Sequence, residues 1–164
     1  MKAGALLKRQ RGLAAVELAI VATVVLVVLF GVLEAGRLLW TWNMLNEVTR
    51  RAARLAAVCP VDSTTQANVR NTAVFGGGML SGLQSAHVIL QYLDRDGAVL
   101  ANPGGADFVR IAFVRAAIDN GANGYRYRLL IPLHIQTLAP LRFSTTVVAE
   151  SLGVSPVGTG TTSC

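Results

Sequence analysis

An uninterrupted apolar run near the start of the chain dominates the hydrophobic pattern. Residues 13–33 make a stretch of 21 residues in which only Glu17 is charged. With a rise of about 1.5 Å per residue, a helix over this run is about 32 Å long, enough to cross the hydrocarbon core of a bilayer. The pattern predicts a transmembrane helix. A carboxylate inside such a span is costly, so Glu17 is a candidate functional residue.

The helical pattern continues beyond the apolar run. No Gly or Pro occurs between Arg37 and Cys59, and apolar residues recur on one face at spacings of three and four. These residues are Leu38, Trp42, Leu45, Val48, Ala52, Leu55 and Cys59. Because Pro60 ends the pattern, we expect a single helix over residues 13–58, about 69 Å long.

The charges that flank the apolar run predict its orientation. Four basic residues and no acids precede it, and Arg37 is the only basic residue in the 15 positions that follow it. By the positive-inside rule the N-terminal segment lies in the cytoplasm, with Trp40 and Trp42 at the outer interface. A cleaved secretory signal is the alternative, although the run is longer than the usual apolar core of a signal peptide.

The rest of the chain predicts one small α+β domain. A short helix is expected over residues 65–74, capped by Asp62 or Ser63. Strands are expected over residues 86–93, 98–100, 108–118, 125–131 and 143–152. The turn residues 119–124 predict a hairpin between the third and fourth of these strands, with Arg126 and Arg128 on its solvent face. The predicted fold is a long N-terminal helix packed on a small antiparallel sheet.

The net charge of +6 comes mainly from the first 12 residues. Without them, 11 basic residues stand against 9 acidic ones. No basic run interleaved with aromatic residues follows, so the charge does not point to nucleic acid as a partner.

The two cysteines, Cys59 and Cys164, both fall on the predicted outer side of the membrane. In an oxidising compartment such as the periplasm we expect a disulfide between them. A bridge closing so long a loop contributes about 4–5 kcal/mol in the loop-entropy model. A buried free Cys59 with a frayed Cys164 is the alternative.

The sequence contains no recognisable enzymatic or metal site. His87 and His134 are isolated in the sequence, and Ser144 and Ser151 lack the surroundings of a catalytic nucleophile. The acids at turns are expected to cap the backbone, although a calcium site around Asp94 and Asp96 stays open. We expect no enzyme activity, cofactor or metal.

The segment Arg11-Gly12-Leu13-Ala14-Ala15-Val16-Glu17, continued by the apolar run into Leu33-Glu34-Ala35-Gly36-Arg37, resembles the TadE-like pseudopilins of tight-adherence (Flp-type) pilus systems. Classical type IV pilins usually have Phe after the glycine, and Leu13 departs from them. The resemblance implies a type IV pilin-like fold and cleavage by prepilin peptidase between Gly12 and Leu13. It also implies that Glu17 pairs with the freed amino group of a neighbouring subunit.

The resemblance implies four parts of the chain and a set of partners. The parts are a cytoplasmic leader (1–12), a transmembrane segment (13–33), the periplasmic continuation of the helix (34–59) and a periplasmic domain (60–164). The implied partners are prepilin peptidase, other pilins or pseudopilins, inner-membrane platform proteins and the lipid bilayer. The rival hypothesis is a permanently anchored periplasmic binding or adhesion module, for which no cleavage is needed.

Overall fold

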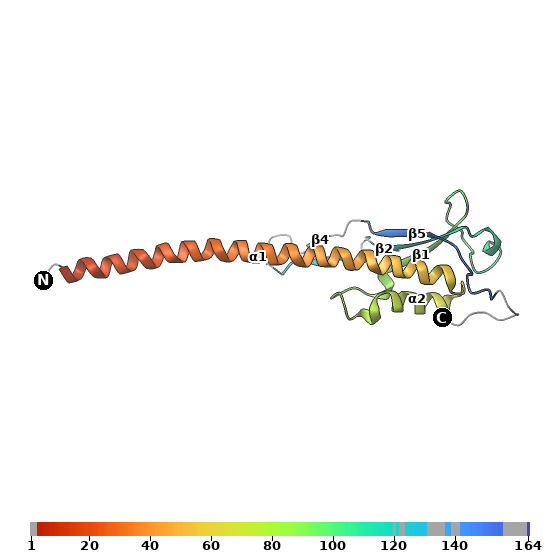
Figure 1. Ribbon diagram of the computed structural model, residues 1–164, viewed down its shortest axis with the longest axis horizontal. Helices are drawn as coiled ribbons and strands as arrows, with labels where there is room; N and C mark the ends of the chain where they lie inside the picture. The colour runs from red at the N-terminus through yellow and green to blue at the C-terminus, as the bar shows by residue number, and fades with distance from the viewer. Residues whose placement is uncertain (1–2, 120, 122–123, 131–136, 139–141, 156–163) are drawn as a thin grey trace.

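The computed structural model describes residues 3–119, 121, 124–130, 137–138, 142–155 and 164. Its longest element is helix α1, Ala3–Val58, of 56 residues, which is about 84 Å long. The N-terminal half of α1 stands free, and its C-terminal half lies in a small domain (Figure 1). The predicted α+β fold, a long helix on a small antiparallel sheet, is confirmed.

Helix α1 begins at Ala3, whereas the sequence pattern placed its start at Leu13. The segment before Leu13 is rich in Ala, Leu, Lys, Gln and Arg, which are strong helix formers. Because Gly12 alone does not stop a helix flanked by such residues, the helix extends through it.

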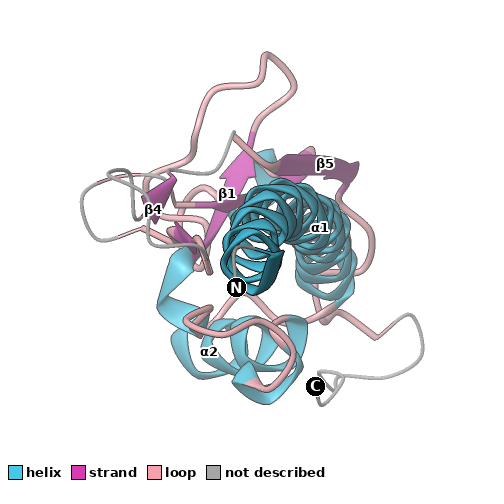
Figure 2. Cartoon of the chain, turned by 90° about the vertical axis from the view of Figure 1, so that its left-hand side faces the viewer, coloured by secondary structure: helices cyan, strands magenta, loops and turns pink. Residues whose placement is uncertain are grey.

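The C-terminal half of α1 lies between the sheet and helix α2, Ser63–Ala73 (Figure 2). Its contact face carries small side chains, and Ala52, Ala53, Ala56 and Ala57 are at most 1% exposed. Small residues let the helix pack closely against elements on both sides. Towards the C-terminus the buried face is therefore wider than the single stripe that the sequence predicted, whereas Leu38 and Trp42 of that stripe are exposed.

Three strands form the main sheet in the order β1-β2-β5. They are β1 (Val88–Leu93), β2 (Phe113–Ile118) and β5 (Ser144–Val148), and both pairings are antiparallel. Along β2, Val114, Ala116 and Ile118 are buried in alternation with partly exposed residues. The sheet thus buries one face of β2 against the core that it shares with α1.

The predicted hairpin across residues 119–124 is wrong. The chain does turn there, since the Tyr125 amide donates to the Asp119 carbonyl at 3.0 Å. Strand β2 already has β1 and β5 on its two edges, so the next segment cannot pair with it. Instead, β3 (Tyr127–Arg128) pairs with β4 (Thr137–Leu138) in a separate two-stranded sheet. Arg126 and Arg128 are exposed, as predicted.

Other predicted boundaries shift because short 3-10 turns replace the ends of strands. The turn Ser85–His87 delays the start of β1, and the turn Phe108–Arg110 delays that of β2. The expected strand at 98–100 is reduced to one bridge between Leu93 and Val99. The last strand is shorter than predicted. Helix α2 begins two residues before its predicted start, with Asp62 as its cap.

The segment after β5 crosses the end of α1 and caps it. The Ala57 carbonyl accepts from the amides of Glu150 and Leu152, at 3.1 and 3.2 Å, and the Val58 carbonyl accepts from that of Gly153 at 2.8 Å. These bonds satisfy carbonyls that a helix end leaves without partners. A Cβ on Gly153, where φ is +81°, would lie 2.4 Å from a Pro60 carbon, so only glycine fits there.

Candidate functional site on helix α1

The free half of α1 is an apolar surface that the rest of the described chain leaves uncovered. From Gly12 to Leu33 every side chain is exposed. The most apolar window of 18 residues has a mean hydropathy of 2.8, and none of it is buried inside the protein. An apolar surface of this length is costly in water but favourable in lipid. The helix is therefore suited by length and composition to anchor the protein in a membrane.

The predicted processing residues, Gly12 and Leu13, lie in continuous helical backbone and are both exposed. A Cβ built on Gly12 would meet no atom within 4 Å. The fold itself therefore does not need glycine at this position, although glycine costs a helix about 1 kcal/mol relative to alanine. The same open space surrounds Gly31 and Gly36.

The predicted assembly residue, Glu17, is exposed on the same helix, four positions after Leu13. This spacing places the two residues on one face, about 6 Å apart along the axis. In the part of the chain that the structure describes, Glu17 has no hydrogen bond or ion pair. Thr23 differs, because its hydroxyl donates to the Ala19 carbonyl at 2.8 Å. A carboxylate in an apolar surround needs a partner, and the described part of the chain supplies none for Glu17.

A second acidic residue of the helix, Glu34, has its hydrogen-bond and ion-pair partners within the chain. It accepts a hydrogen bond from the Tyr127 hydroxyl at 2.5 Å and one from the Leu130 amide at 3.1 Å. Arg37 forms an ion pair with it at 3.2 Å, and the Arg37 guanidinium lies 5.5 Å from the centre of the Tyr127 ring. These four residues form a cluster that we call the Glu34 latch. It ties segment 127–130 to α1.

The contacts of the latch shift the pKa values of the Glu34 carboxyl and the Tyr127 hydroxyl. The hydrogen bond from Tyr127 is the main reason why the pKa of Glu34 is lowered from 4.5, and the Leu130 amide and Arg37 act in the same direction. Burial, with the bond to Glu34 second, raises the pKa of Tyr127 to about 12. The pair is therefore held as a carboxylate and a neutral phenol over the whole neutral range.

Glu34 belongs to the sequence segment that carries the family resemblance, but the sequence did not predict its contacts in the latch. Its spacing of three from Arg37 signals a helix ion pair. Nothing in the sequence links either residue to Tyr127, which follows 93 residues after Glu34 and was predicted to lie in a hairpin with β2.

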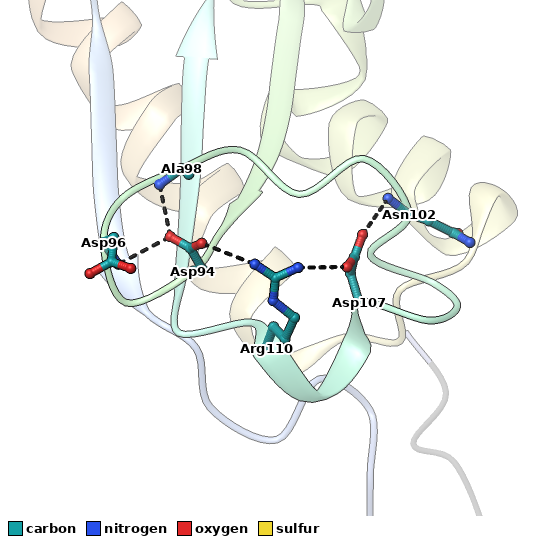
Figure 3. A network of polar contacts seen from close by, with 6 residues as sticks. All are labelled: Asp94, Asp96, Ala98, Asn102, Asp107 and Arg110. Atoms are coloured by element: carbon teal, nitrogen blue, oxygen red, sulfur yellow. Dashed lines mark hydrogen bonds and ion pairs between the residues drawn. The ribbon is translucent and has the colours of Figure 1, made fainter.

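Three of the four acids expected at turns, Asp94, Asp96 and Asp107, lie in a polar network at the end of the domain remote from the N-terminus (Figure 3). The fourth, Asp119, accepts separately from the Gly121 amide. One Asp94 oxygen accepts from the amides of Asp96 and Ala98, at 3.0 and 2.8 Å. Arg110 bridges Asp94 and Asp107 at 3.4 and 3.2 Å. These carboxylates hold turns together, as predicted. Among the described residues, no group of three His, Cys, Asp or Glu side chains could hold a metal ion.

The predicted disulfide is present in the structure. Cys59 and Cys164 are bridged, with 5.9 Å between their Cα atoms. Cys59 is buried directly after the end of α1, where segment 150–153 caps the helix. The bridge therefore reinforces the contact between the tail and the helix end. His134, the second isolated histidine, lies outside the described residues.

One comparison with known proteins bears directly on the helix. Residues 12–54 match the family of TadE-like proteins. The resemblance inferred from the motif is thus confirmed for most of α1, including Gly12, Glu17 and Glu34. The match ends within the helix and does not extend to the sheet. No curated protein and no solved structure gives a significant match. The TadE-like segment points to a part in tight-adherence pilus systems.

Proposed function

We propose that this TadE-like protein is a minor pseudopilin, cut by prepilin peptidase after Gly12 and acting in the assembly of a tight-adherence pilus. It is held in the inner membrane by residues 13–33, with the leader in the cytoplasm and the α+β domain in the periplasm. The TadE-like match over residues 12–54 carries the proposal, because it begins at the proposed cleavage residue and includes Glu17. The protein has no enzymatic role in this proposal.

The geometry of Gly12 supports its role as a recognition residue. The fold gives no packing reason for glycine at this position. A peptidase must open the helix locally to reach the bond, and glycine lowers the cost of doing so. In this proposal a small residue is needed at position 12 for recognition by the peptidase, not for the fold.

Glu17 supports assembly because its partner must come from another group. Cleavage creates an amino group on Leu13, one turn away from it. Within one chain the two can neutralise each other at i, i+4. Between parallel chains, Glu17 of one subunit meets the amine of the next when the helices are staggered by about 6 Å. In an apolar surround such a contact is much stronger than in water, so it favours one register between otherwise uniform apolar helices.

The processing step is tested by the intact mass of the membrane protein, with and without the peptidase. We expect a loss of residues 1–12 that depends on the peptidase, and a Gly12→Val variant that stays uncut. Gly31→Val is the matched control, since Gly31 has the same open surroundings on the same helix. Processing of the Gly12→Val variant at the normal rate would contradict the proposal and favour a permanently anchored binding or adhesion module.

A further inference from the structure

An open cavity of about 540 Å³ lies between α1, the loop that follows α2 and the segment that contains β3. The Glu34 latch fixes the position of this cavity along α1. Because Tyr127 and Leu130 bond to Glu34, this segment reaches the level of the first residue after the apolar run. Arg37 lies about 6 Å and Trp40 about 10 Å beyond Leu33 along the axis. The headgroup layer on each side of a bilayer is about 5–8 Å thick. In the proposed topology the cavity therefore begins within the outer headgroup layer at Arg37 and reaches just beyond it at Trp40.

The lining combines two cations with exposed apolar side chains. Arg37 shares its charge with Glu34, whereas Arg128 has no acidic partner in the described part of the chain. Trp40 and Met79 are each 50% exposed and Leu130 is 66% exposed. Guanidinium groups suit a phosphate, and large apolar side chains, tryptophan above all, suit the membrane interface beside it. Contacts within the domain explain the position of Arg37, but in the described part of the chain they give Arg128 no acidic partner and leave Trp40, Met79 and Leu130 exposed.

Two other charged surfaces of the domain do not fit this ligand. Arg50 lies about 25 Å beyond Leu33 along α1, well over a Debye length of about 8 Å from the headgroups. The polar network of Figure 3 lies at the opposite end of the domain, and Arg110 there is already paired with two carboxylates. The cavity beside the latch thus combines two properties: it holds Arg128, a cation without an acidic partner in the described chain, and it lies close to the membrane surface in the proposed topology.

We propose that this cavity binds the phosphodiester headgroup of an anionic phospholipid in the outer leaflet, with Arg128 as its main cation. The inference rests on the membrane topology proposed above. A bound headgroup holds the domain at one height against the membrane surface. The latch serves this site indirectly, since it positions the segment that carries Arg128.

The test measures lipid binding to the purified full-length protein by native mass spectrometry in detergent, with added phosphatidylglycerol or phosphatidylcholine. We expect phosphatidylglycerol to bind more tightly, and Arg128→Gln to weaken its binding about fivefold, the effect of one arginine at an anionic surface. Arg126→Gln is the matched control. Arg126 is also exposed and lies two residues away, but it is not among the residues that line the cavity.

Three outcomes would overturn the lipid site: equal losses in the two variants, no preference over phosphatidylcholine, or displacement of the lipid by millimolar inorganic phosphate. Equal losses would indicate diffuse surface charge, and displacement would indicate a soluble anion as the ligand. Flotation with liposomes separates this test from that of the topology. Wild-type protein that fails to float refutes the membrane span, whereas normal flotation without selectivity that depends on Arg128 refutes the lipid site alone.

Discussion

Replacing Tyr127 by Phe removes the strongest contact of the Glu34 latch while keeping the ring. The hydroxyl donates to a carboxylate whose side chain is 12% exposed. A hydrogen bond to a charged group contributes about 1.5–3 kcal/mol, and the remaining access to water favours the lower end. We therefore expect the docking of segment 127–130 on α1 to weaken by about 1.5 kcal/mol, slightly more than a tenfold change in its equilibrium.

Hydrogen exchange at the Leu130 amide reports this docking directly, because that amide donates to the same carboxylate. Local undocking exposes it, so its protection should fall about tenfold in Tyr127→Phe while protection of the sheet stays unchanged. Tyr125→Phe is the matched control. Tyr125 is buried two residues away, and its hydroxyl has no hydrogen bond within the described residues. Equal protection of Leu130 in both variants would refute the role of the latch.

Protection of the Leu130 amide from hydrogen exchange should be lost at both low and high pH. The lowered pKa of Glu34 makes the carboxylate form favour docking, so this contribution is present above pH 4.5 and is lost as the pH falls through the lowered value. The raised pKa of Tyr127 makes its neutral form favour docking, so this contribution is lost as the pH rises from about 10 through about 12. Protection, corrected for intrinsic exchange, should be flat between these limits. A decline centred near pH 7 would contradict this assignment.

Three further predictions test the rest of the molecule. Gly153→Ala should lower the free energy of unfolding by more than about 2 kcal/mol in thermal denaturation, because it adds a clash to a left-handed backbone; Gly82→Ala, with φ +82° and open space, should cost only about 1 kcal/mol. Serine at both Cys59 and Cys164 should cost about 4–5 kcal/mol in the loop-entropy model, and recovery of free thiols by non-reducing peptide mapping of the exported protein would refute the bridge. Glu17→Gln should insert and be cleaved, yet fail to co-purify with pilus partners; normal piliation would exclude an assembly role.

The sequence alone determined the helix and most of what is proposed for its free half. Apolar length, small residues and helical spacing act within a few turns, so Leu13 and Glu17 could be placed on one helix without any tertiary contact. The extension of that helix through Gly12 was not predicted. The cap of α2 at Asp62 and the turn at Asp94 are equally local, since each side chain bonds to a backbone amide within four residues. The Cys59–Cys164 pairing needed only the count of cysteines and the predicted compartment.

The tertiary structure decided which strands pair and what the polar residues of the helix contact. Residues 125–128 alternate between apolar and polar side chains, as a hairpin strand does. Such alternation does not reveal that both edges of β2 are already paired with other strands. Tyr127 instead lies against α1, where it meets Glu34. Contacts between residues so far apart depend on which packing buries the most apolar surface and satisfies the most polar groups together. The latch and the cavity beside it exist only in the folded chain, because the segments that form them share no local pattern.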